Sequence, residues 1–452
     1  MRRERTRRRP PSGRGYVPGV SDDLTAWLRA NARRLATLDP DADDDTDLLP
    51  LLEIVGDARV VAVGESMHRL HETYLVRHRV LRFLARHGFT AYVMESGFPE
   101  GRLVDEWVAG RSARPVREVL EQGVTYSMGR CQEMLDLLAW LRTDGGVRFY
   151  GADVPDSAAS ARPAVEVVEA FLADVDPGYA AHVLADLLPL FGYLPADRSG
   201  IAQAAPALHA YIALPAAERA ALTALVGELA ERVRARRVDY LEAGADPEEV
   251  AFAVHAARVA RQTDAFLAAM PAGATRAYPP GNVRDVTMAD TVEWVLEREP
   301  RVVVAAANGH VQRTPFHAPP FVPQPMTTMG RELADRLGDD LVVLGTTFGG
   351  GTAWLHRPGP DDAPGHSTPF TQDLGALDPG SLDAALAAPG LGSYFVDLRT
   401  ADGAAAAALD ATRGTHNGAE LQLVDARRAF DAVVHIDRVT PWHTWIPVPG
   451  GR

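Results

Sequence analysis

The chain has 452 residues, of which 46% are hydrophobic and 23% are charged, and its formal net charge is −14 at pH 7. This composition is typical of a globular protein with two or three domains, or with one domain that carries a large insertion. The negative charge excludes a general nucleic-acid-binding surface, and no apolar run reaches the roughly 18 residues of a membrane span.

Residues 1–20 are predicted to form a disordered basic tail. Their start, "MRRERTRRRPP", has six arginines among its first nine residues, and no apolar stretch follows that would make it a secretory signal. Such a composition keeps a segment solvated. Because Cys131 is the single cysteine, no intrachain disulfide is expected, and a cytoplasmic location is the default.

Five short runs predict the strands of a central sheet. They are almost continuously apolar, as strands buried on both faces of a parallel sheet are. A helical pattern that ends near Gly88 separates the first two runs, which makes a strand–helix–strand unit. We therefore expect an α/β fold with a mostly parallel central sheet covered by helices. The runs are "ARVVAV" at 58–63, "TAYVME" at 90–95, "VRFYGA" at 147–152, "RVVVAAA" at 301–307 and "DLVVLGT" at 340–346.

The remaining segments divide the chain into three parts after the tail. Residues 21–155 and 271–452 are expected to form the two halves of the α/β catalytic domain. Residues 156–270 are rich in Ala, Leu, Glu and Arg and predict a helical insertion that forms a cap or lid. Residues 354–390 have the composition of a loop, and "SYFVDL" and "AVVHIDR" predict edge strands near the end of the chain.

Titratable side chains follow four of the five predicted strands. In open α/β sheets, ligands bind outside the carboxyl ends of the strands, so these side chains are expected to meet at one edge. Arg77, on the helix after the first strand, is expected to turn towards the same place. We therefore predict a functional site there. Its residues are Glu65 and His68 after the first strand, Glu95 in the second, Asp153 after the third, and Asn308 and His310 after the fourth.

Some of these residues have structural alternatives. Asp153 is also placed to cap an Asx turn before Pro155. Glu95 ends an apolar strand, and a buried carboxylate needs a partner, for which Arg77 is the candidate.

Several catalytic classes are excluded by the sequence. No G-x-S-x-G motif supports a nucleophilic serine, and "HRLHE" matches neither common zinc-helix motif. All 46 basic residues are arginine, which excludes Schiff-base chemistry and a P-loop lysine. Neither a metal nor a cofactor is expected, although the spacing of His68, His310 and the carboxylates is compatible with a metal. A histidine flanked by carboxylates, with arginine nearby, is typical of general-base activation of water.

A set of motifs resembles the erythromycin esterase family. They occur in order from about residue 50 to beyond residue 430 and include "GESMH", "GFTAYVMESGFPEG", "WVAG", "GADVP", "RDVTMADTVEW" and "NGHVQRTP". The resemblance implies hydrolysis of a macrolide lactone without a serine nucleophile, by a histidine that activates water.

The resemblance also assigns residue roles. His68 corresponds to the general base of the "GExxH" motif, Glu65 to its acid, Arg77 to its helix arginine and Glu95 to the strand-end carboxylate. His310 corresponds to the second histidine of an "H-N-x-H" pattern, and Ala307 stands where that pattern has the first. The pair Arg284 and Asp285 also resembles the family, and Arg284 either faces the cleft or makes a salt bridge at the start of a helix. We expect the five polar residues to be catalytic, and Asp153, Arg284 and Asn308 to bind substrate.

Three functions are compatible with these residues. The first is an esterase-like hydrolase of a macrolactone or polyketide ester, which implies antibiotic resistance. The second is a tailoring enzyme that performs cyclisation, dehydration or acyl transfer in polyketide biosynthesis, because Ala307 removes one imidazole. The third is a non-catalytic macrolide-binding protein. In each case the expected partner is a small molecule, a macrolide or polyketide, and not a nucleic acid or a membrane.

Overall fold

The computed structural model describes residues 21–144, 146–195, 204–270, 279–320, 322–357 and 368–446. The tail predicted for residues 1–20 therefore lies outside the described residues. Among those that are described, no helix combines the length and the apolar character that crossing a bilayer requires.

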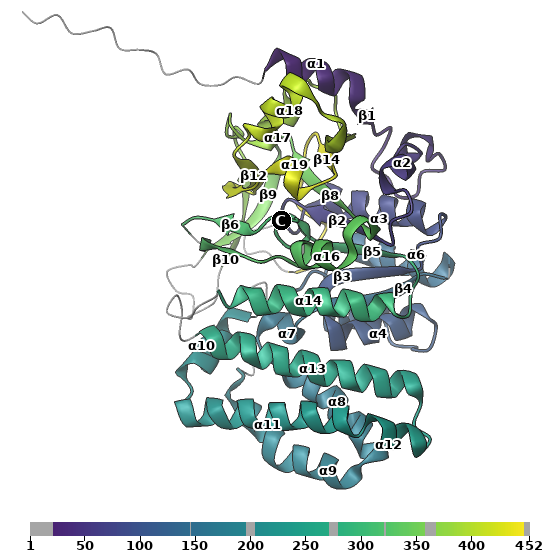
Figure 1. Ribbon diagram of the computed structural model, residues 1–452, viewed down its shortest axis with the longest axis vertical. Coiled ribbons are helices and arrows are strands. Elements are labelled where there is room, and N and C mark those ends of the chain that lie inside the picture. Colours follow the sequence, from purple (N-terminus) through teal and green to yellow (C-terminus); the bar gives the residue numbers. More distant parts are fainter. Residues whose placement is uncertain are drawn as a thin grey trace, which may run out of the picture.

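A large sheet organises the described chain (Figure 1). Its strand order is β1-β11-β14-β8-β2-β5-β3-β4. The strands from β14 to β4 pair in parallel, and β11 is antiparallel to β14 and to β1. Their bounds are β1 Arg33–Arg34, β2 Val60–Glu65, β3 Ala91–Gly97, β4 Arg148–Asp153, β5 Val302–Ala307, β8 Leu341–Phe348, β11 Tyr394–Asp397 and β14 Ala432–Ile436.

The predicted parallel sheet is confirmed. All five apolar runs form neighbouring parallel strands, and the described strands β2, β3 and β8 are buried along their whole length. The edge prediction is wrong for both strands, because β14 lies between β8 and β11, and β11 lies between β14 and β1. All five residues of β14 are buried, with His435 as the one polar residue among them, so the strand fits an interior position.

Helices cover both faces of the sheet because alternate strand residues point to opposite sides. Val61 and Val63 face one core, which contains residues of α2 to α6, whereas Val60 and Ala62 face another, which contains residues of α1, α14 and α16 to α19. The bounds are α1 Asp22–Asn31, α2 Leu51–Val55, α3 His71–Ala85, α4 Phe98–Val108, α5 Val116–Gly123, α6 Gln132–Asp144, α14 Gly281–Leu296, α15 Asn308–Val311, α16 Met329–Leu337, α17 Leu382–Ala387, α18 Gly403–Asp410 and α19 Ala426–Ala429.

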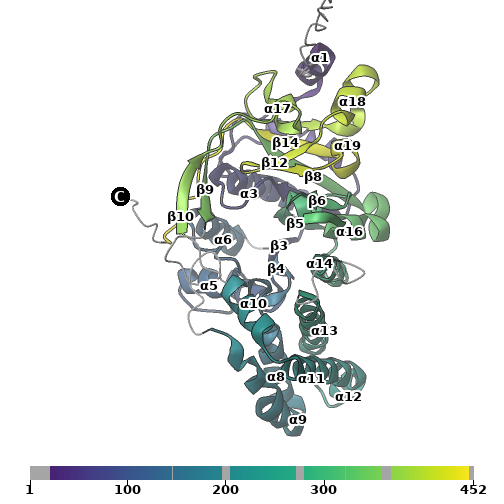
Figure 2. The same cartoon turned by 90° about the vertical axis from the view of Figure 1, so that its left-hand side faces the viewer.

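The predicted helical region is present and has its own core. It extends beyond the β4 side of the sheet (Figures 1 and 2). Leu172, Leu229 and Val259 are among its buried residues, and Phe98 of α4 joins the same core. Asp246 caps the long helix α13 by accepting from Glu248 N–H and Glu249 N–H. The helices are α7 Pro155–Ala158, α8 Arg162–Val175, α9 Pro177–His182, α10 Ala204–Ala213, α11 Ala216–Ala235, α12 Arg237–Glu242 and α13 Pro247–Ala269.

Two smaller sheets were not predicted. An antiparallel sheet has the order β12-β13-β6-β7, and β9 pairs with β10 as a hairpin. The loop predicted for residues 354–390 is therefore wrong where β9, β10 and α17 form. The bounds are β6 Phe316–Ala318, β7 Val322–Met326, β9 Thr352–Arg357, β10 Thr368–Asp373, β12 Gly414–Asn417 and β13 Glu420–Leu423.

Candidate active site

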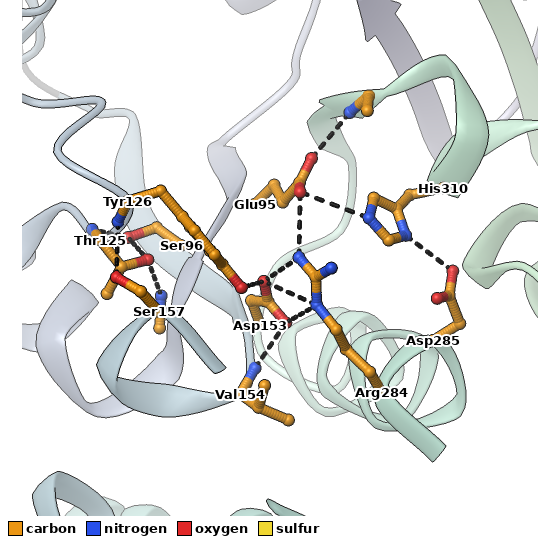
Figure 3. A network of polar contacts seen from close by, with 12 residues as sticks. Glu95, Ser96, Thr125, Tyr126, Asp153, Val154, Ser157, Arg284, Asp285 and His310 are labelled. Carbon is orange, nitrogen blue, oxygen red and sulfur yellow. Dashed lines mark hydrogen bonds and ion pairs between the residues drawn. The ribbon is translucent and has the colours of Figure 1, made fainter. Parts of the chain in front are cut away.

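The carboxyl ends of four neighbouring parallel strands carry the polar residues of the site. Glu65 ends β2, Asp153 ends β4, and His310 lies on α15 directly after β5. Glu95 lies in β3 where the pairing register with β4 shifts, between Met94 and Gly97. Such an irregularity re-aims side chains next to functional sites. Helix α14 brings Arg284 to the same place (Figure 3).

His68 and Glu65 form the first pair of the site. His68 Nδ1 contacts Glu65 Oε1, and its Nε2 lies 3.7 Å from Glu95 Oε1. Burial raises the pKa of Glu65, but the charges of Arg77 and then of His68 outweigh it, so the pKa is lowered. Glu65 is therefore a carboxylate that accepts from Nδ1–H, which leaves Nε2 as the nitrogen that can take a proton. The His68 side chain is 33% exposed, so water reaches it.

Arg77 forms an ion pair with Glu65 on the side away from the pocket. Its Nη1 lies 3.1 Å from Glu65 Oε2, and only 2% of the residue is exposed. The proposed convergence of Arg77 and His68 is thus indirect, because both contact Glu65. Helix α3 begins at His71, and Arg69 at the bend before it has a φ of 68°, which is uncommon for a residue other than glycine. The predicted pairing of Arg77 with Glu95 is wrong.

Glu95 is instead the centre of a second network (Figure 3). Its Oε1 lies 3.0 Å from Arg284 Nη2 and 3.3 Å from His310 Nε2, and its Oε2 accepts from Ala307 N–H at 2.8 Å. Burial raises the pKa of Glu95, but the charges of His310, His68 and Arg284 hold that pKa well below its usual value. Glu95 is therefore charged at neutral pH.

His310 lies between two carboxylates. Its Nδ1 contacts Asp285 Oδ1 at 2.8 Å, and the same oxygen accepts from Met329 N–H at 2.8 Å. Burial lowers the pKa of His310, but the charges of Asp285 and Glu95 outweigh burial and raise it to about 10. His310 is therefore an imidazolium at neutral pH, unlike a histidine that acts as a base.

Asp153 binds Arg284 and does so with both oxygens. The Nε–Oδ1 distance is 2.9 Å and the Nη2–Oδ2 distance is 2.6 Å. Tyr126 donates its hydroxyl to Asp153 Oδ2 at 2.9 Å, and the Arg284 guanidinium lies 5.4 Å from the centre of the Tyr126 ring. Asp153 also accepts from Val154 N–H at 2.7 Å, but helix α7 has no side-chain cap, so the ion pair with Arg284 and not a cap is the main contact of Asp153.

Beside these groups lies a pocket of about 220 Å³. His68, Arg284, Asp285 and His310 reach it, and four of its residues come from the small sheet β12-β13-β6-β7. No described residue of 156–270 lines it, so a lid role for that region stays a prediction. The lining residues are Glu65, Ser66, Met67, His68, Arg284, Asp285, Ala307, Gly309, His310, Phe316, Met326, Asn417 and Gln422.

Asn308 does not line this pocket. Its Nδ2 donates to the Thr346 carbonyl at 2.7 Å, and its Oδ1 accepts from Thr346 N–H at 3.0 Å. These bonds tie the start of α15 to β8 next to Gly64, where a Cβ would collide with Asn308 Oδ1. Asn308 therefore positions α15, and its predicted contact with substrate stays a prediction.

Two residues of the site were missed from the sequence. Tyr126 lies in a loop 27 residues before Asp153, and nothing local indicates their contact. Ser66 lies inside the "GESMH" motif, which was a usable signal. Its hydroxyl has no hydrogen-bond partner among the described residues and it lines the pocket, so it is free to contact a ligand.

The first cluster has ligands that suit a metal, because atoms of Glu65, His68 and Glu95 lie within 4.8 Å of one another. However, Arg77 and Arg284 already neutralise the two carboxylates, and a cation beside a divalent ion is unfavourable. The expectation that this site needs no metal stays a prediction.

Comparisons with known proteins place this architecture among related chains. A family model described as "Erythromycin esterase" matches residues 84–439. Erythromycin esterase type II of Escherichia coli is 31% identical over 377 residues, which cover 79% of this chain and 84% of that protein. Erythromycin esterase type I of Escherichia coli is 23% identical over 345 residues, which cover 74% and 81%.

Two solved structures share the fold. A protein from Bacillus cereus has a TM-score of 0.74 at 24% identity, with 94% of this chain and 99% of that chain covered. An erythromycin esterase mutant in its open conformation has a TM-score of 0.74 at 19% identity, with 91% and 98% covered.

Proposed function

The chain belongs to the erythromycin esterase family, and we propose that it is a hydrolase in which His68 activates water to open the lactone of a macrolide or related polyketide. The observation that carries this proposal is the contrast between the two histidines of the pocket. His68 is held by Glu65 with Nε2 left to accept a proton, whereas His310 is held as an imidazolium by Asp285 and Glu95. One base and one cation in one pocket are what ester hydrolysis by water requires.

The reaction follows from these charges. His68 Nε2 takes a proton from water, and the oxygen of that water attacks the lactone carbonyl carbon. Glu65 stabilises the imidazolium that forms on His68. When the tetrahedral intermediate collapses, the C–O bond of the lactone breaks, and His68 returns the proton to the leaving alkoxide. The product is an open-chain hydroxy acid.

Arg284 and His310 stabilise the oxyanion of the intermediate. Both line the pocket and both are cationic. Asp153 and Tyr126 hold Arg284 in place, so they are positioning residues and do not contact the reacting atoms. Arg77 is likewise a positioning residue, because it contacts Glu65 and does not line the pocket.

The pocket restricts which part of a substrate reaches the base. A volume of about 220 Å³ lies below the roughly 300–1,000 Å³ of pockets that enclose drug-sized ligands. The lactone group and its neighbouring atoms therefore enter, and the rest of the macrocycle lies against the apolar rim of Met67, Phe316 and Met326.

A second function is favoured by Ala307. Its side chain lines the pocket where an imidazole stands in the resembling pattern, which leaves room beside Glu95. The same base and cation would then catalyse cyclisation, dehydration or acyl transfer on a polyketide-like substrate.

Mass spectrometry of erythromycin incubated with the protein distinguishes these functions. We expect the mass to increase by one water, and His68→Asn to reduce the rate by about 10²–10⁴-fold, since asparagine takes no proton. His209→Ala, at an exposed histidine of α10, is the control and keeps the wild-type rate. An isomeric or dehydrated product supports the tailoring enzyme, and binding without any product contradicts both.

A further inference from the structure

A second cluster of potential ligands lies outside the site described above. It comprises His71 at the start of α3, Glu133 at the start of α6, and His443 near the end of the described chain. The Nδ1 atoms of His71 and His443 lie 2.6 Å and 3.0 Å from the same oxygen, Glu133 Oε1. One ligand atom from each of the three residues lies within 4.8 Å of the others.

The hydrogen bonding of this cluster is unbalanced. Glu133 Oε1 also accepts from His443 N–H at 2.9 Å, so three groups point at an oxygen that has two lone pairs. The other oxygen, Oε2, is buried and has no hydrogen-bond partner among the described residues. Only 5% of Glu133 is exposed, so water does not compensate. His71 hydrogen-bonds to Oε1 through Nδ1, His443 Nδ1 lies 3.0 Å from the same oxygen as an ion-pair contact, and the two ring centres are 4.4 Å apart.

The charge of the cluster also differs from that of the active site. Glu65 and Glu95 each have an arginine as an ion-pair partner. In the described part of the chain, Glu133 has ion-pair contacts with the two histidines alone. The carboxylate therefore lacks a permanent positive charge beside it, which a bound cation would supply.

We propose that His71, Glu133 and His443 bind a divalent transition ion of the zinc class. Two imidazole nitrogens and one carboxylate oxygen are ligands that zinc prefers, and water completes a tetrahedral site. The ion takes the lone pairs of both Nδ1 atoms, which removes the excess of donors at Oε1. Ligand atoms around tetrahedral zinc are about 3.3 Å apart, so the two Nδ1–Oε1 distances of 2.6 Å and 3.0 Å have to lengthen slightly. The His443 side chain is 64% exposed and is free to make that adjustment.

The ion would fasten the last described segment, residues 437–446, to the loop that carries His68. This segment already follows that loop closely: Trp442 N–H donates to the Arg69 carbonyl at 3.0 Å, and His71 N–H donates to the Thr440 carbonyl at 2.9 Å. His71 lies three residues after His68. A metal at this cluster therefore stabilises the surroundings of the catalytic loop without contacting substrate.

Calorimetric titration of the chelator-treated, tag-free protein with zinc chloride tests this site. We expect about one zinc per chain, and a rise in melting temperature with zinc. His443→Ala removes an exposed side chain, so it should fold like the wild type, and its zinc affinity should fall by more than about tenfold with no zinc-dependent rise in melting temperature. The control His209→Ala should bind zinc like the wild type.

Two results would overturn the proposal. One is a wild-type protein that binds no zinc. The other is zinc binding that persists in His443→Ala but is lost in His68→Asn, which would place the ion at Glu65, His68 and Glu95. Either result leaves the proposed hydrolysis to be judged by its own product assay, because the zinc titration measures no turnover.

Discussion

At the scale of single residues, neighbouring carboxylates decide which histidine is the base. His310 lies between Asp285 and Glu95, and both charges favour its protonated form. His68 contacts Glu65, whose charge is already shared with Arg77, and its Nε2 lies 3.7 Å from Glu95 Oε1, farther than His310 Nε2 at 3.3 Å. Two histidines of one pocket thus receive different chemical tasks from their contacts.

The alkaline limit of activity follows from the pKa of His310. Because that pKa is raised to about 10, we expect kcat/KM for lactone hydrolysis to fall as the pH rises through 10, where the cation that stabilises the oxyanion is lost. His310→Gln should be slow at neutral pH and should show no such fall. A pH profile of both proteins tests this, and an unchanged alkaline limit in His310→Gln would assign it to another group.

The space at Ala307 gives a second prediction. Ala307 lines the pocket, and its N–H bonds to Glu95. An imidazole at this position would fill part of a small pocket that already holds two cations, and it would displace the substrate from the base. We therefore expect Ala307→His to lower kcat/KM by about tenfold or more. Ala307→Ser is the control with a small side chain. If Ala307→His instead hydrolyses erythromycin faster than the wild type, the missing histidine limits esterase activity.

At the scale of elements, close backbone approach determines how helices meet the sheet. Helix α4 lies against β4, and a Cβ on Gly101 would be 2.5 Å from Gly151 N. Because the obstacle is backbone, the helix itself would have to move. Glu100 directly precedes Gly101 in α4. Its carboxyl group accepts from Asp156 N–H at 2.7 Å and thereby ties α4 to α7.

A pair of glycine substitutions tests this packing. Gly101→Ala should lower the free energy of unfolding by about 1–3 kcal/mol through overpacking. Gly227, inside α11, has no atom within 4 Å of the added Cβ, so Gly227→Ala should raise the free energy of unfolding by about 0.5–1 kcal/mol through helix propensity. Urea denaturation measures both. Equal effects of the two substitutions on the free energy of unfolding would show that the close approach of α4 to β4 at Gly101 does not destabilise the alanine variant.

At the scale of the whole molecule, buried histidines make stability depend on pH in both directions. Burial, followed by Arg258, lowers the pKa of His255 to about 3, and burial lowers that of His435 to about 4. The unfolded chain binds protons at both positions below the ordinary histidine pKa of 6.5, so stability is lost as the pH falls below 6.5. His310 has the opposite shift, so its contribution is complete below 6.5 and is lost as the pH rises through about 10.

We therefore expect these three histidines to contribute most to the free energy of unfolding near pH 6.5. The buried carboxyls of Glu100 and Asp383 act in the opposite direction on the acid side, because burial raises their pKa values to about 7 and the folded chain keeps their protons. On either side, each proton that only one of the folded and unfolded chains binds changes the free energy of unfolding by about 1.36 kcal/mol per pH unit. Urea denaturation across the pH range measures the curve. Relative to the wild type, His310→Gln should lose less stability between pH 6.5 and 10, and His255→Gln should lose less stability as the pH falls from 6.5 to about 3. A curve that rises from pH 6.5 towards 10 would contradict the assigned charge of His310.

The sequence by itself determined the central sheet, the helical character of residues 156–270 and most of the polar edge. Apolar strands, helical spacing and the residues that follow a strand are local features, and parallel strands bring their carboxyl ends together by topology.

The tertiary structure alone decided which groups pair. Arg284 reaches Glu95 across 189 residues, so Arg77 is left to Glu65, and Tyr126 joins Asp153 from a loop. The pocket wall on β6, β7, β12 and β13 likewise comes from short segments whose sequences carry little periodicity. Charge partners and pocket walls depend on long-range packing, which no window of sequence contains.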